Sequence, residues 1–590
     1  MKRLNITLSD IAHLCKANLF LLLMALSALA MSLVSCESLD DSIGTDPYGG
    51  GREPLGIKLL SEAPVPASGV PGDTVVFKAE GLSKWCNPAS GRYDFTMYMG
   101  EEPAEIITAT DTTLTVRVPQ ELSTGITYLV LQNQVFYGPT FTVNGNLSVD
   151  KEFGLYKDQT QFSGAIYDAV ESKQKGQGNT FYLVGDINYM IDKGNLCRGI
   201  ALLNSNGNLT TSTNNYFKSV RGTIISALDV NKAYLRSVSL THDNRMMVSG
   251  VFSNFYSAFT NDQKKYLKNT TYLYTNNMTM LAANALVDTV QSVFSEGYTG
   301  SKYIPLPVPS FNGGFKQEVL RSFVTKAEKA SDQKVIAVGN FNQYTTTDYQ
   351  TSYYSSDEKL TTVSGVCRMN LDGSLDTSYR PAASHPGANG SITDAYLDED
   401  NGVVLIGNFT AFDGKAANGV VRLDADGNVD DAYMSHIRNG FNGTITKVRY
   451  NEDTHSAIFV GRFTAVGNHH TQYIAKVGKD GVIDEGFKVE GFEGGVPTFG
   501  CIVSRQLPKV IVAGTFTTFK GVHRRGFLVL DMDGKVTQKF NVPGAFEGEI
   551  YQVRETETSL GEYGLLLLGD FTKFNGETVN NAVMLQADFQ

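Results

Sequence analysis

The sequence is poor in the residues and spacings that identify disulfide-bonded, redox and metal-binding domains. Its 590 residues include 6 cysteines, and none forms a Cys-x-x-Cys pair. In an exported protein Cys86, Cys197, Cys367 and Cys501 could pair in three ways, and the sequence does not choose among these pairings. Cys367 lies in an apolar stretch, where a buried free thiol is the expected state. We therefore expect no disulfide framework.

Basic charge and helical periodicity are also scarce. Lys and Arg number 50 against 61 Asp and Glu, which gives a net charge of −11. No basic stripe interrupts this acidic background, which argues against a nucleic-acid partner. Few stretches repeat apolar residues at helical spacing. The chain is instead rich in Gly, Tyr and Phe, with 58, 28 and 33 residues, a composition typical of turn-rich β-structure.

The motifs of common catalytic and cofactor sites are missing as well. The sequence contains no His-Glu-x-x-His, no Gly-x-Ser-x-Gly and no phosphate-binding loop. His469-His470 is an adjacent pair on a short loop. Asp424-x-Asp426-Gly427 resembles the start of a calcium loop without its terminal Glu, so we interpret it as a turn. We predict no catalytic residue, no metal and no cofactor, while carboxylates paired from distant loops remain open.

The N-terminus carries an export signal. Three basic residues precede an apolar run over 17–34 that ends in Leu33-Val34-Ser35-Cys36. The run is about long enough for a membrane span, but a cysteine directly after Leu-Val-Ser and before a polar chain resembles the lipobox of bacterial lipoproteins. The resemblance implies a signal peptide over 1–35 and lipidation of Cys36. The mature chain is then tethered by acyl groups and not inserted.

Residues 36–54 form an acidic, glycine-rich tether that cannot bury a core. Acidic residues directly after the lipidated cysteine resemble the surface-export signal of Bacteroidetes lipoproteins. That resemblance implies a location in the outer membrane, with the lipid-anchored chain facing the cell exterior.

Residues 55–145 have the pattern of a small β-sandwich. Short alternating strands are expected at 74–77, 95–99, 114–118 and 127–131. Turn signals such as Pro71-Gly72-Asp73 separate them, and their spacing suits an immunoglobulin-like sandwich. With Gly138-Pro139-Thr140-Phe141-Thr142-Val143 the segment also resembles the IPT/TIG family, whose domains usually act as spacers in extracellular bacterial proteins. Trp85, the single Trp, is interpreted as a packing residue.

From residue 180 onward the sequence repeats an apolar strand that ends in Gly-x-Phe or a close variant. The repeated glycines are Gly185, Gly250, Gly339, Gly407, Gly461, Gly514 and Gly569. The last four are spaced by 54, 53 and 55 residues, and a period near 50 with several strands per unit is typical of propeller blades. Five units also contain an Asp-Gly or Asn-Gly turn, as at Asp426-Gly427, which suits a two-residue hairpin.

This pattern closely resembles the delta-60 repeat propellers of bacterial surface proteins, with 404–427 as a near-complete example. We expect a β-propeller over 146–590 with seven blades, each with a fourth strand after its turn, as at Ser374-Leu375-Asp376-Thr377. The seventh unit ends after its third strand, and residues 146–153 resemble a fourth strand. A strand near 146–153 is therefore expected to complete the last blade and close the ring, which removes open sheet edges.

Long insertions lie in the loops between the second and third strands of a blade and in the loops between successive blades. In a propeller both kinds of loop lie on the same face. We expect this face to carry a binding site, and the sandwich to attach on the opposite side. The insertions are rich in Tyr, whose ring suits sugars or extended peptides. The candidate ligand-binding residues are Tyr256, Tyr266, Tyr344, Tyr349, Tyr353 and Tyr354. The same residues could instead fix the long loops to the propeller.

Three functions stay open on the sequence. The first, which we favour, is a non-enzymatic surface lipoprotein that captures a glycan or peptide nutrient, or an accessory subunit of a TonB-dependent outer-membrane importer with SusC/SusD-like components. The family resemblances imply this context. The second is a propeller glycoside hydrolase or lyase, which needs clustered acids on the decorated face. The third is a structural or adhesive surface protein.

Overall fold

The computed structural model describes residues 54–87, 90–173, 178–191, 195–210, 233–256, 272–282, 287–296, 300–307, 314–348, 357–437 and 440–589. The expected signal peptide (1–35), Cys36 and the tether up to residue 53 lie outside these ranges. The described chain is almost entirely β-structure, as its composition predicts. None of the described helices is both long and apolar enough to cross a membrane.

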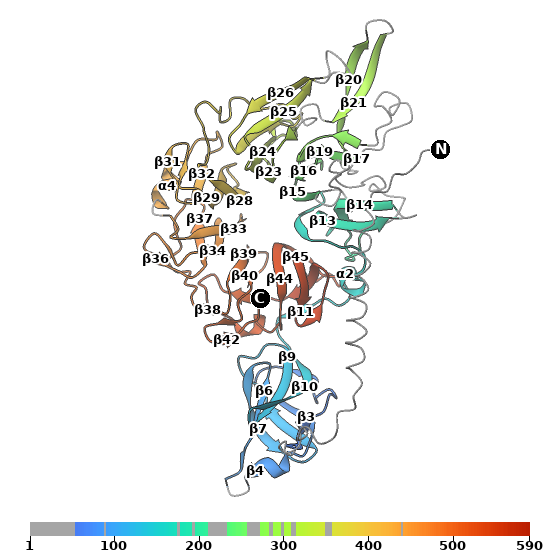
Figure 1. The fold of residues 1–590 in the computed structure, drawn as a ribbon, viewed down its shortest axis with the longest axis vertical. Helices are drawn as coiled ribbons and strands as arrows, with labels where there is room; N and C mark the ends of the chain where they lie inside the picture. Colours follow the sequence, from blue (N-terminus) through green and yellow to red (C-terminus); the bar gives the residue numbers. More distant parts are fainter. Residues whose placement is uncertain are drawn as a thin grey trace, which may run out of the picture. The chain divides into compact units, whose positions relative to one another are not determined.

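The N-terminal β-domain is built on an eight-stranded sheet in the order β1-β3-β8-β7-β6-β9-β10-β2 (Figure 1). Alternate residues of these strands are buried, including Phe77, Met97, Val116 and Leu129, and the four strands expected from the sequence are all present. The elements are β1 (Lys58–Leu59), β2 (Ser68–Gly69), β3 (Thr74–Glu80), η1 (Ser83–Trp85), β4 (Cys86–Asn87), β5 (Arg92–Tyr93), β6 (Thr96–Met99), β7 (Glu102–Ala109), β8 (Thr113–Arg117), β9 (Gly125–Leu131) and β10 (Gln134–Val143).

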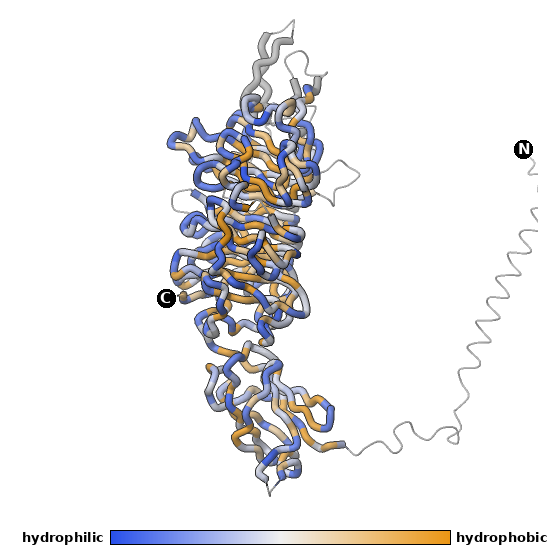
Figure 2. Tube along the Cα trace, turned by 90° about the vertical axis from the view of Figure 1, so that its left-hand side faces the viewer, coloured by the Kyte–Doolittle hydropathy of each residue, from blue (hydrophilic) through white to orange (hydrophobic). Residues whose placement is uncertain are grey.

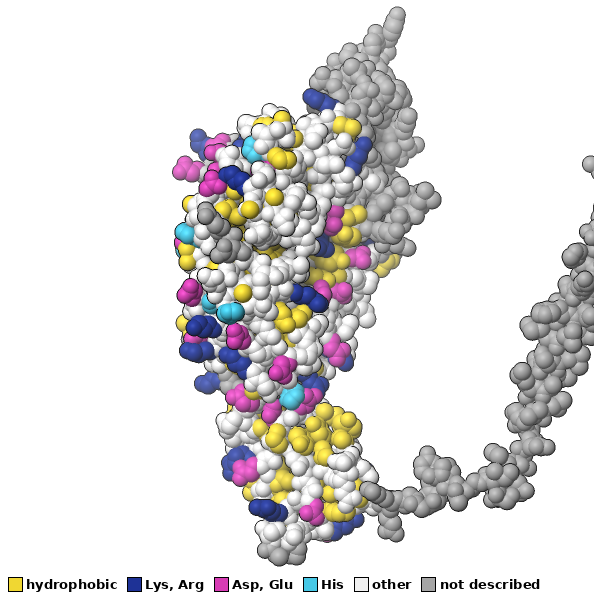
Figure 3. Space-filling view, turned by 60° about the vertical axis from the view of Figure 1, so that its left-hand side comes forward, with side chains coloured by type: hydrophobic (Ala, Val, Ile, Leu, Met, Phe, Trp, Pro, Cys, Tyr) yellow, Lys and Arg dark blue, Asp and Glu magenta, His cyan; other side chains and the backbone are white. Residues whose placement is uncertain are grey.

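One face of this sheet carries a row of tyrosines. Tyr98 of β6 and Tyr137 of β10 both lie opposite Tyr128 of β9. The rings of Tyr98 and Tyr128 stack with their centres 5.0 Å apart. Ile126 and Val135 on the same strands are also exposed, and Figure 3 shows apolar side chains gathered on the surface of this domain. The outer face of the sheet is therefore less polar than that of a typical solvated sheet.

The rest of the described chain forms small antiparallel sheets around a common centre, as the blades of a β-propeller (Figure 1). Strands are apolar and connections polar (Figure 2). The sheets are β12 (Ile166–Glu171), β13 (Phe181–Ile191), β14 (Asn195–Leu203); β15 (Tyr234–Leu240), β16 (Met246–Val251), β19 (Met278–Leu281); β23 (Val319–Val324), β24 (Lys334–Gly339), β27 (Val366–Asn370); β28 (Ser391–Leu397), β29 (Val403–Asn408), β32 (Val420–Leu423); β33 (Thr444–Asn451), β34 (Ser456–Arg462), β37 (Ile474–Gly478); β39 (Pro497–Val503), β40 (Lys509–Gly514), β43 (Phe527–Leu530); and β44 (Glu547–Glu557), β45 (Tyr563–Phe574), β47 (Ala582–Ala587), β11 (Leu147–Val149).

Shorter elements lie in the connections between these strands. Two of the hairpins, β20–β21 and β25–β26, form where the sequence has long insertions. The elements are α2 (Gly154–Lys157), β17 (Asn254–Tyr256), β18 (Tyr272–Tyr274), β20 (Thr289–Glu296), β21 (Gly300–Pro307), β22 (Gly314–Phe315), η4 (Ala330–Asp332), β25 (Gln343–Asp348), β26 (Asp357–Thr362), β30 (Ala411–Phe412), β31 (Lys415–Ala416), α4 (Asp431–His436), β35 (Ala465–Val466), β36 (His469–His470), β38 (Phe492–Glu493), β41 (Thr518–Phe519), β42 (Val522–His523), η5 (Gln538–Phe540) and β46 (Glu577–Thr578).

The expected fourth strand of the repeat is reduced to a single bridge. After one Asp-Gly turn, Leu375 pairs with Met369, and this is the pairing that the structure shows over 374–377. The reason lies in Asp376, whose carboxylate accepts hydrogen bonds from the backbone N–H (3.1 Å) and hydroxyl (2.6 Å) of Ser378. Arg368 Nε donates to the same carboxylate at 3.0 Å. Such local bonds hold the chain in a turn and compete with a strand ladder.

The repeated glycine of Gly-x-Phe marks a β-bulge in the first strand of each described sheet. Gly461, for example, lies opposite Ile445, and the register shifts directly afterwards, between Ile445 and Lys447. A Cβ at Gly461 would come closer than 3.0 Å to the carbonyl oxygen of Thr444. The six other glycines of the repeat have the same relationship. Close backbone approach at a bulge therefore explains the repeat.

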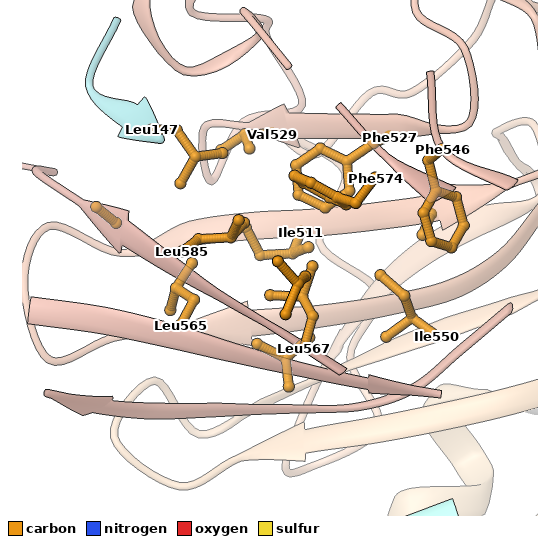
Figure 4. Packing of buried hydrophobic residues seen from close by; sticks show 14 of the residues in the cluster. Leu147, Ile511, Phe527, Val529, Phe546, Ile550, Leu565, Leu567, Phe574 and Leu585 are labelled. Atoms are coloured by element: carbon orange, nitrogen blue, oxygen red, sulfur yellow. The ribbon is translucent and has the colours of Figure 1, made fainter. Parts of the chain in front are cut away.

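Neighbouring sheets pack through shared apolar clusters. β11 pairs with β47, with Leu147 opposite Ala587. Figure 4 shows Leu147 beside Leu585 and Val529 in the cluster between the last two sheets. Buried side chains of the first sheet, such as Leu183, share another cluster with Leu566 of the last sheet. Each such side chain stabilises the fold by roughly 1.5–3 kcal/mol.

The N-terminal domain contacts the propeller through the connections of its last two sheets. Arg524, which follows β42, donates to the carboxylate (2.9 Å) and the backbone carbonyl (3.0 Å) of Glu121. The N–H of Thr124 donates to the carbonyl of Val542 at 2.9 Å. Arg524 lies in the loop between the second and third strands of its sheet, and Val542 lies in the connection between the last two sheets. Both kinds of connection belong to the face that we expected to carry the binding site. Our expectation that the N-terminal domain attaches on the opposite face is therefore wrong. The chain enters through β11, at an outer sheet edge, and this places the domain beside those connections.

Candidate functional site

The first strands of the sheets bring polar side chains together at the centre. Tyr167 of β12, Arg236 of β15 and Lys447 of β33 line one small cavity, although their strands belong to three different sheets. Thr393 and Asp394 of β28 are consecutive and both line it. Two neighbours on a regular strand would point to opposite faces, so the β-bulge accounts for this arrangement.

Asp394 holds two arginines from neighbouring sheets. Arg321 of β23 donates through Nε to Oδ1 at 2.8 Å, and Arg449 donates through Nη1 to Oδ2 at 2.7 Å. Only 4% of the Asp394 side chain is exposed. Burial alone would raise the pKa of this carboxyl, but Arg321, Arg449 and Lys447 hold the pKa well below its ordinary value. Asp394 is therefore a buried carboxylate that ties three sheets together.

Asp168 of β12 is the second anion at the centre. Gln552 Nε2 donates to its Oδ1 at 2.9 Å, and Nη2 of Arg554 lies 3.5 Å from the same atom. Its Oδ2 lies 3.7 Å from Nη1 of Arg321. Because Arg321 contacts both carboxylates, the side chains form one network. We call it the central cluster, and its members are Asp168, Arg321, Asp394, Arg449 and Arg554.

On one side of the central cluster lies a cavity of about 20 Å³, room for roughly one water molecule. Lys447 Nζ lies 5.0 Å from the ring centre of Tyr551, and Arg236 lies 5.3 Å from that of Tyr167. Burial, followed by the repulsion of Arg449, Arg321 and Arg236, lowers the pKa of Lys447 to about 7 against the attraction of Asp394. This side of the cluster is closely packed.

On the other side lies a cavity of about 330 Å³, which we call the central chamber. Its lining includes Asp168, Arg321, Arg449 and Arg554, together with Ser239 and Tyr396. The ring of Tyr396 stacks on that of Tyr450, with centres 4.8 Å apart and planes 1° from parallel. The chamber thus combines guanidinium groups, largely buried at Arg321 and Arg449 and 37% exposed at Arg554, with apolar aromatic surface, a combination typical of small-molecule sites.

Of the tyrosines proposed from the sequence, Tyr344 has a described side chain, and it does not line this site. Tyr344 is buried, its ring packs against Phe315, and its hydroxyl donates to the carbonyl of Gly373 at 2.9 Å. It is therefore a packing residue, and its assignment to ligand binding is wrong. Tyr256 ends β17, but its side chain lies outside the described part of the chain, as do Tyr266, Tyr349, Tyr353 and Tyr354.

Sequence reasoning missed the residues of the central cluster. Each stands in a first strand, two or four positions after the residue that faces the repeated glycine. Asp168, Arg321 and Asp394 lie two positions after it, and Arg449 and Arg554 lie four positions after it. The available signal was a charged residue at a fixed position in strands that are otherwise apolar. Buried charges are rare unless they are paired, so their recurrence could have identified the centre.

A larger cavity of about 810 Å³ lies between the N-terminal domain and the last two sheets. His523 faces Glu101 at 2.7 Å and Glu102 at 3.2 Å, and Arg525 contacts Glu101. Because these pairs cross the cavity, we interpret it as the joint of the two domains. Among the described residues no group of His, Cys, Asp and Glu has a metal-binding arrangement, and Cys86, Cys197, Cys367 and Cys501 form no disulfide bonds.

Comparison with protein families gives three matches. Residues 32–139 match a domain of unknown function, DUF5008, and residues 143–239 match a second, DUF5124. Residues 399–433, which contain β29 to β32, match the domain of unknown function DUF5122, described as a β-propeller. The chain is an all-β protein with N-terminal β-domains and a β-propeller. This agrees with the general fold expected from the repeat, and no curated protein matches the chain.

Among solved structures, the WD40 β-propeller domain of Doa1 is 12% identical, with a TM-score of 0.32 over 72% of this chain and 96% of that chain. A structural-genomics protein of unknown function from Bacteroides thetaiotaomicron is 9% identical (TM-score 0.24; 90% and 98% covered). A protein described as an auxiliary nutrient binding protein from the same species is 10% identical (TM-score 0.18; 68% and 94% covered). Likeness of this degree does not bear on the site.

Proposed function

We propose that this protein is a non-enzymatic surface lipoprotein that captures a small nutrient in its central chamber. The observation that carries the proposal is the chamber itself. Its volume of about 330 Å³ falls within the range of ligand pockets, roughly 300–1,000 Å³. Its lining comes from strands, which hold binding groups more rigidly than loops do.

The charges of the central cluster support binding over catalysis. General acid–base catalysis needs a carboxyl or an imidazole whose pKa lies near the working pH. Asp394 is instead held charged by Arg321 and Arg449, and Asp168 is occupied by Gln552 and Arg554. A glycoside hydrolase or lyase would need a free pair of carboxyl groups.

The finer architecture belongs to the same proposal. The sheets that begin with β12, β15, β23, β28, β33, β39 and β44 are seven blades, and β11 closes the ring by completing the last one. The cluster shared by Leu183 and Leu566, from the first and last sheets, supports this closure. The IPT/TIG-like domain is a spacer between the propeller and a lipid on Cys36, which holds the chain at the outer face of the outer membrane.

Chamber-filling substitution tests the capture function. Ser239 lines the chamber, and Ser239→Phe should fill part of it; Ser331→Phe, on the exposed helix η4, is the matched control. The full chain is screened by thermal shift against mono- and oligosaccharides, short peptides and small organic acids. A solute that binds the folded state at 100 times its Kd stabilises it by about 2.7 kcal/mol. We expect a stabilising solute whose effect is lost in Ser239→Phe and retained in Ser331→Phe.

A negative screen, or a hit that is equally strong in Ser239→Phe, would contradict capture in the chamber.

Partnership has a separate test. We propose that a SusC/SusD-like importer takes up the captured solute, because a tethered binding protein needs a transporter for delivery. Mild-detergent purification of the native lipoprotein should co-purify the importer barrel and its lid in stoichiometric amounts. Recovery of the lipoprotein alone, even after crosslinking, would rule out this partnership.

A further inference from the structure

The charges of the central chamber do not balance. Its lining contains the cations Lys173, Arg321, Arg449 and Arg554 and the anions Asp168 and Glu452. Asp394, which accepts hydrogen bonds from Arg321 and Arg449, adds a third anion. The cations therefore exceed the anions by one. Lys173 and Glu452 are exposed and the Arg554 side chain is 37% exposed, so the surplus charge is only partly desolvated. An anion from solution would neutralise it.

Arg554 is the cation with the most unused hydrogen-bonding capacity. A guanidinium group has five N–H donors, and Arg554 makes one long hydrogen bond among the described residues, from Nη2 to Asp168 at 3.5 Å. Its Nε has no partner among the described residues. The Nε of Arg449 also has no partner among the described residues, but its two Nη atoms donate to Asp394, to the carbonyl of Val448 and to the carbonyl of Tyr551. The unused donors of Arg554 and the surplus charge coincide in one chamber.

A second unpartnered group lies in the wall of the same chamber. The hydroxyl of Ser239 is buried and has no hydrogen-bond partner among the described residues. Buried hydroxyl groups are nearly always hydrogen-bonded, and Ser239 differs from other unpartnered hydroxyls of the described chain, such as those of Thr279 and Thr345, in that its residue lines the chamber. A hydroxyl can donate to an anionic oxygen, as an arginine does.

The rest of the wall limits the size and character of the ligand. Phe323, Tyr396 and Tyr450 supply apolar surface beside the guanidinium groups. A bare inorganic ion would leave this surface unused, and a cavity of about 330 Å³ is near the lower end of the range for ligand pockets, roughly 300–1,000 Å³. The ligand therefore has one anionic group and a compact body with an apolar face.

We propose that the central chamber binds a carboxylate-bearing monosaccharide unit, with the carboxylate on Arg554 and the sugar ring against the aromatic wall. This inference rests on the proposed capture function and names the ligand class. Arginine forms paired hydrogen bonds to a planar carboxylate, and a sugar ring has apolar C–H faces that suit tyrosine. The unit is either a free uronic acid or the end residue of an acidic oligosaccharide.

The test compares galacturonate and glucuronate with galactose and glucose, which lack the carboxylate, by titration calorimetry on the full chain. Acetate and sulfate report on a bare anion, and oligogalacturonate distinguishes an end residue from the free sugar acid. We expect a uronate to bind at least tenfold more tightly than its neutral sugar and than acetate or sulfate. Arg554→Gln should weaken uronate binding at least tenfold. Arg505→Gln, an exposed arginine outside the chamber, should leave it unchanged.

The outcomes separate this inference from the function on which it rests. If a neutral sugar or peptide binds, is blocked by Ser239→Phe and is indifferent to Arg554→Gln, capture stands and the anionic class is wrong. If sulfate and acetate bind as tightly as the uronates, the chamber takes an adventitious ion only. If nothing binds, both proposals fail. Ser239→Ala, which leaves the ion pairs intact, should also weaken uronate binding. It provides a second test of the inference in case Arg554→Gln misfolds.

Discussion

Arg321 and Asp394 form an ion pair across two neighbouring sheets, with Nε of the arginine 2.8 Å from Oδ1 of the aspartate. Their side chains are 12% and 4% exposed. Arg449 joins the same carboxylate from a third sheet. A paired buried charge contributes little net stability, but removal of one partner leaves the others uncompensated. The centre of the propeller is therefore sensitive to substitution at Asp394.

Asp394→Asn should destabilise the protein strongly. The amide keeps the shape of the side chain but leaves Arg321 and Arg449 without their carboxylate, which should cost about 3–5 kcal/mol. Asp431→Asn, whose side chain is 77% exposed in a surface pair with Lys415, should cost no more than about 1 kcal/mol. Urea unfolding followed by tyrosine fluorescence measures both. Equal losses in the two variants would contradict the buried network.

Gly461→Ala should destabilise the protein although alanine suits strands no worse than glycine. The new Cβ would come closer than 3.0 Å to the backbone carbonyl of Thr444, and the bulge must open to admit it, at a cost of about 3 kcal/mol. Gly178 has nothing within 4 Å of the position of a Cβ, so Gly178→Ala should change stability by less than about 0.5 kcal/mol. Thermal unfolding of both variants measures the difference. A harmless Gly461→Ala would refute the close-approach explanation.

The repeat could be predicted because its determinants are local. Gly461 and its equivalents are forced by backbone contact within one sheet, and Asp-Gly turns impose their own geometry, so both recur visibly along the chain. The fourth strand was mispredicted for an equally local reason, since Asp376 bonds its own turn. Tyr344 was mispredicted because the sequence of a long insertion does not distinguish an exposed aromatic residue from a buried one, and Tyr344 is buried.

The pairing within the central cluster could not be predicted in the same way, although the recurring charged position could have indicated the centre. Asp168 and Arg554 are 386 residues apart in sequence and meet because the first and last sheets are neighbours. Their pairing depends on how the sheets are arranged and has no local pattern. A charged residue in a first strand, such as Asp394, could equally face solvent. The sequence alone therefore predicted the scaffold but not the site.

Lys447 should make stability depend on pH in the neutral to alkaline range. Burial lowers its pKa from 10.5 to about 7 in the folded chain, whereas the unfolded chain keeps the ordinary value. Between about pH 7 and pH 10.5 the folded state thus binds fewer protons than the unfolded state, and the contribution of Lys447 to stability rises with pH. Below pH 7 both states are protonated, and the charged amine carries its full desolvation cost.

Lys447→Met should accordingly be more stable than the native chain near pH 7, and this advantage should shrink as the pH rises toward 10.5. Denaturant midpoints of the two proteins are measured at intervals from pH 6 to pH 10. The difference in stability between the proteins at each pH removes the contribution of the titrating groups that both share. Lys415→Met, at a position that is 52% exposed, should give a curve parallel to the native one. A constant offset for Lys447→Met would show that its amine titrates at its ordinary pKa.

Leu147 tests whether β11 closes the ring. Its side chain is 3% exposed and lies in the cluster that joins the last two sheets (Figure 4), so Leu147→Ala should cost about 2–5 kcal/mol. Ser148, the next residue of the same strand, is exposed, and Ser148→Ala should have little effect. If β11 fastens the ring, hydrogen exchange in Leu147→Ala should quicken in β47 and also in β12, because the first sheet packs on Met584 of β47. Faster exchange confined to β11 would mean that this strand is only an appendage.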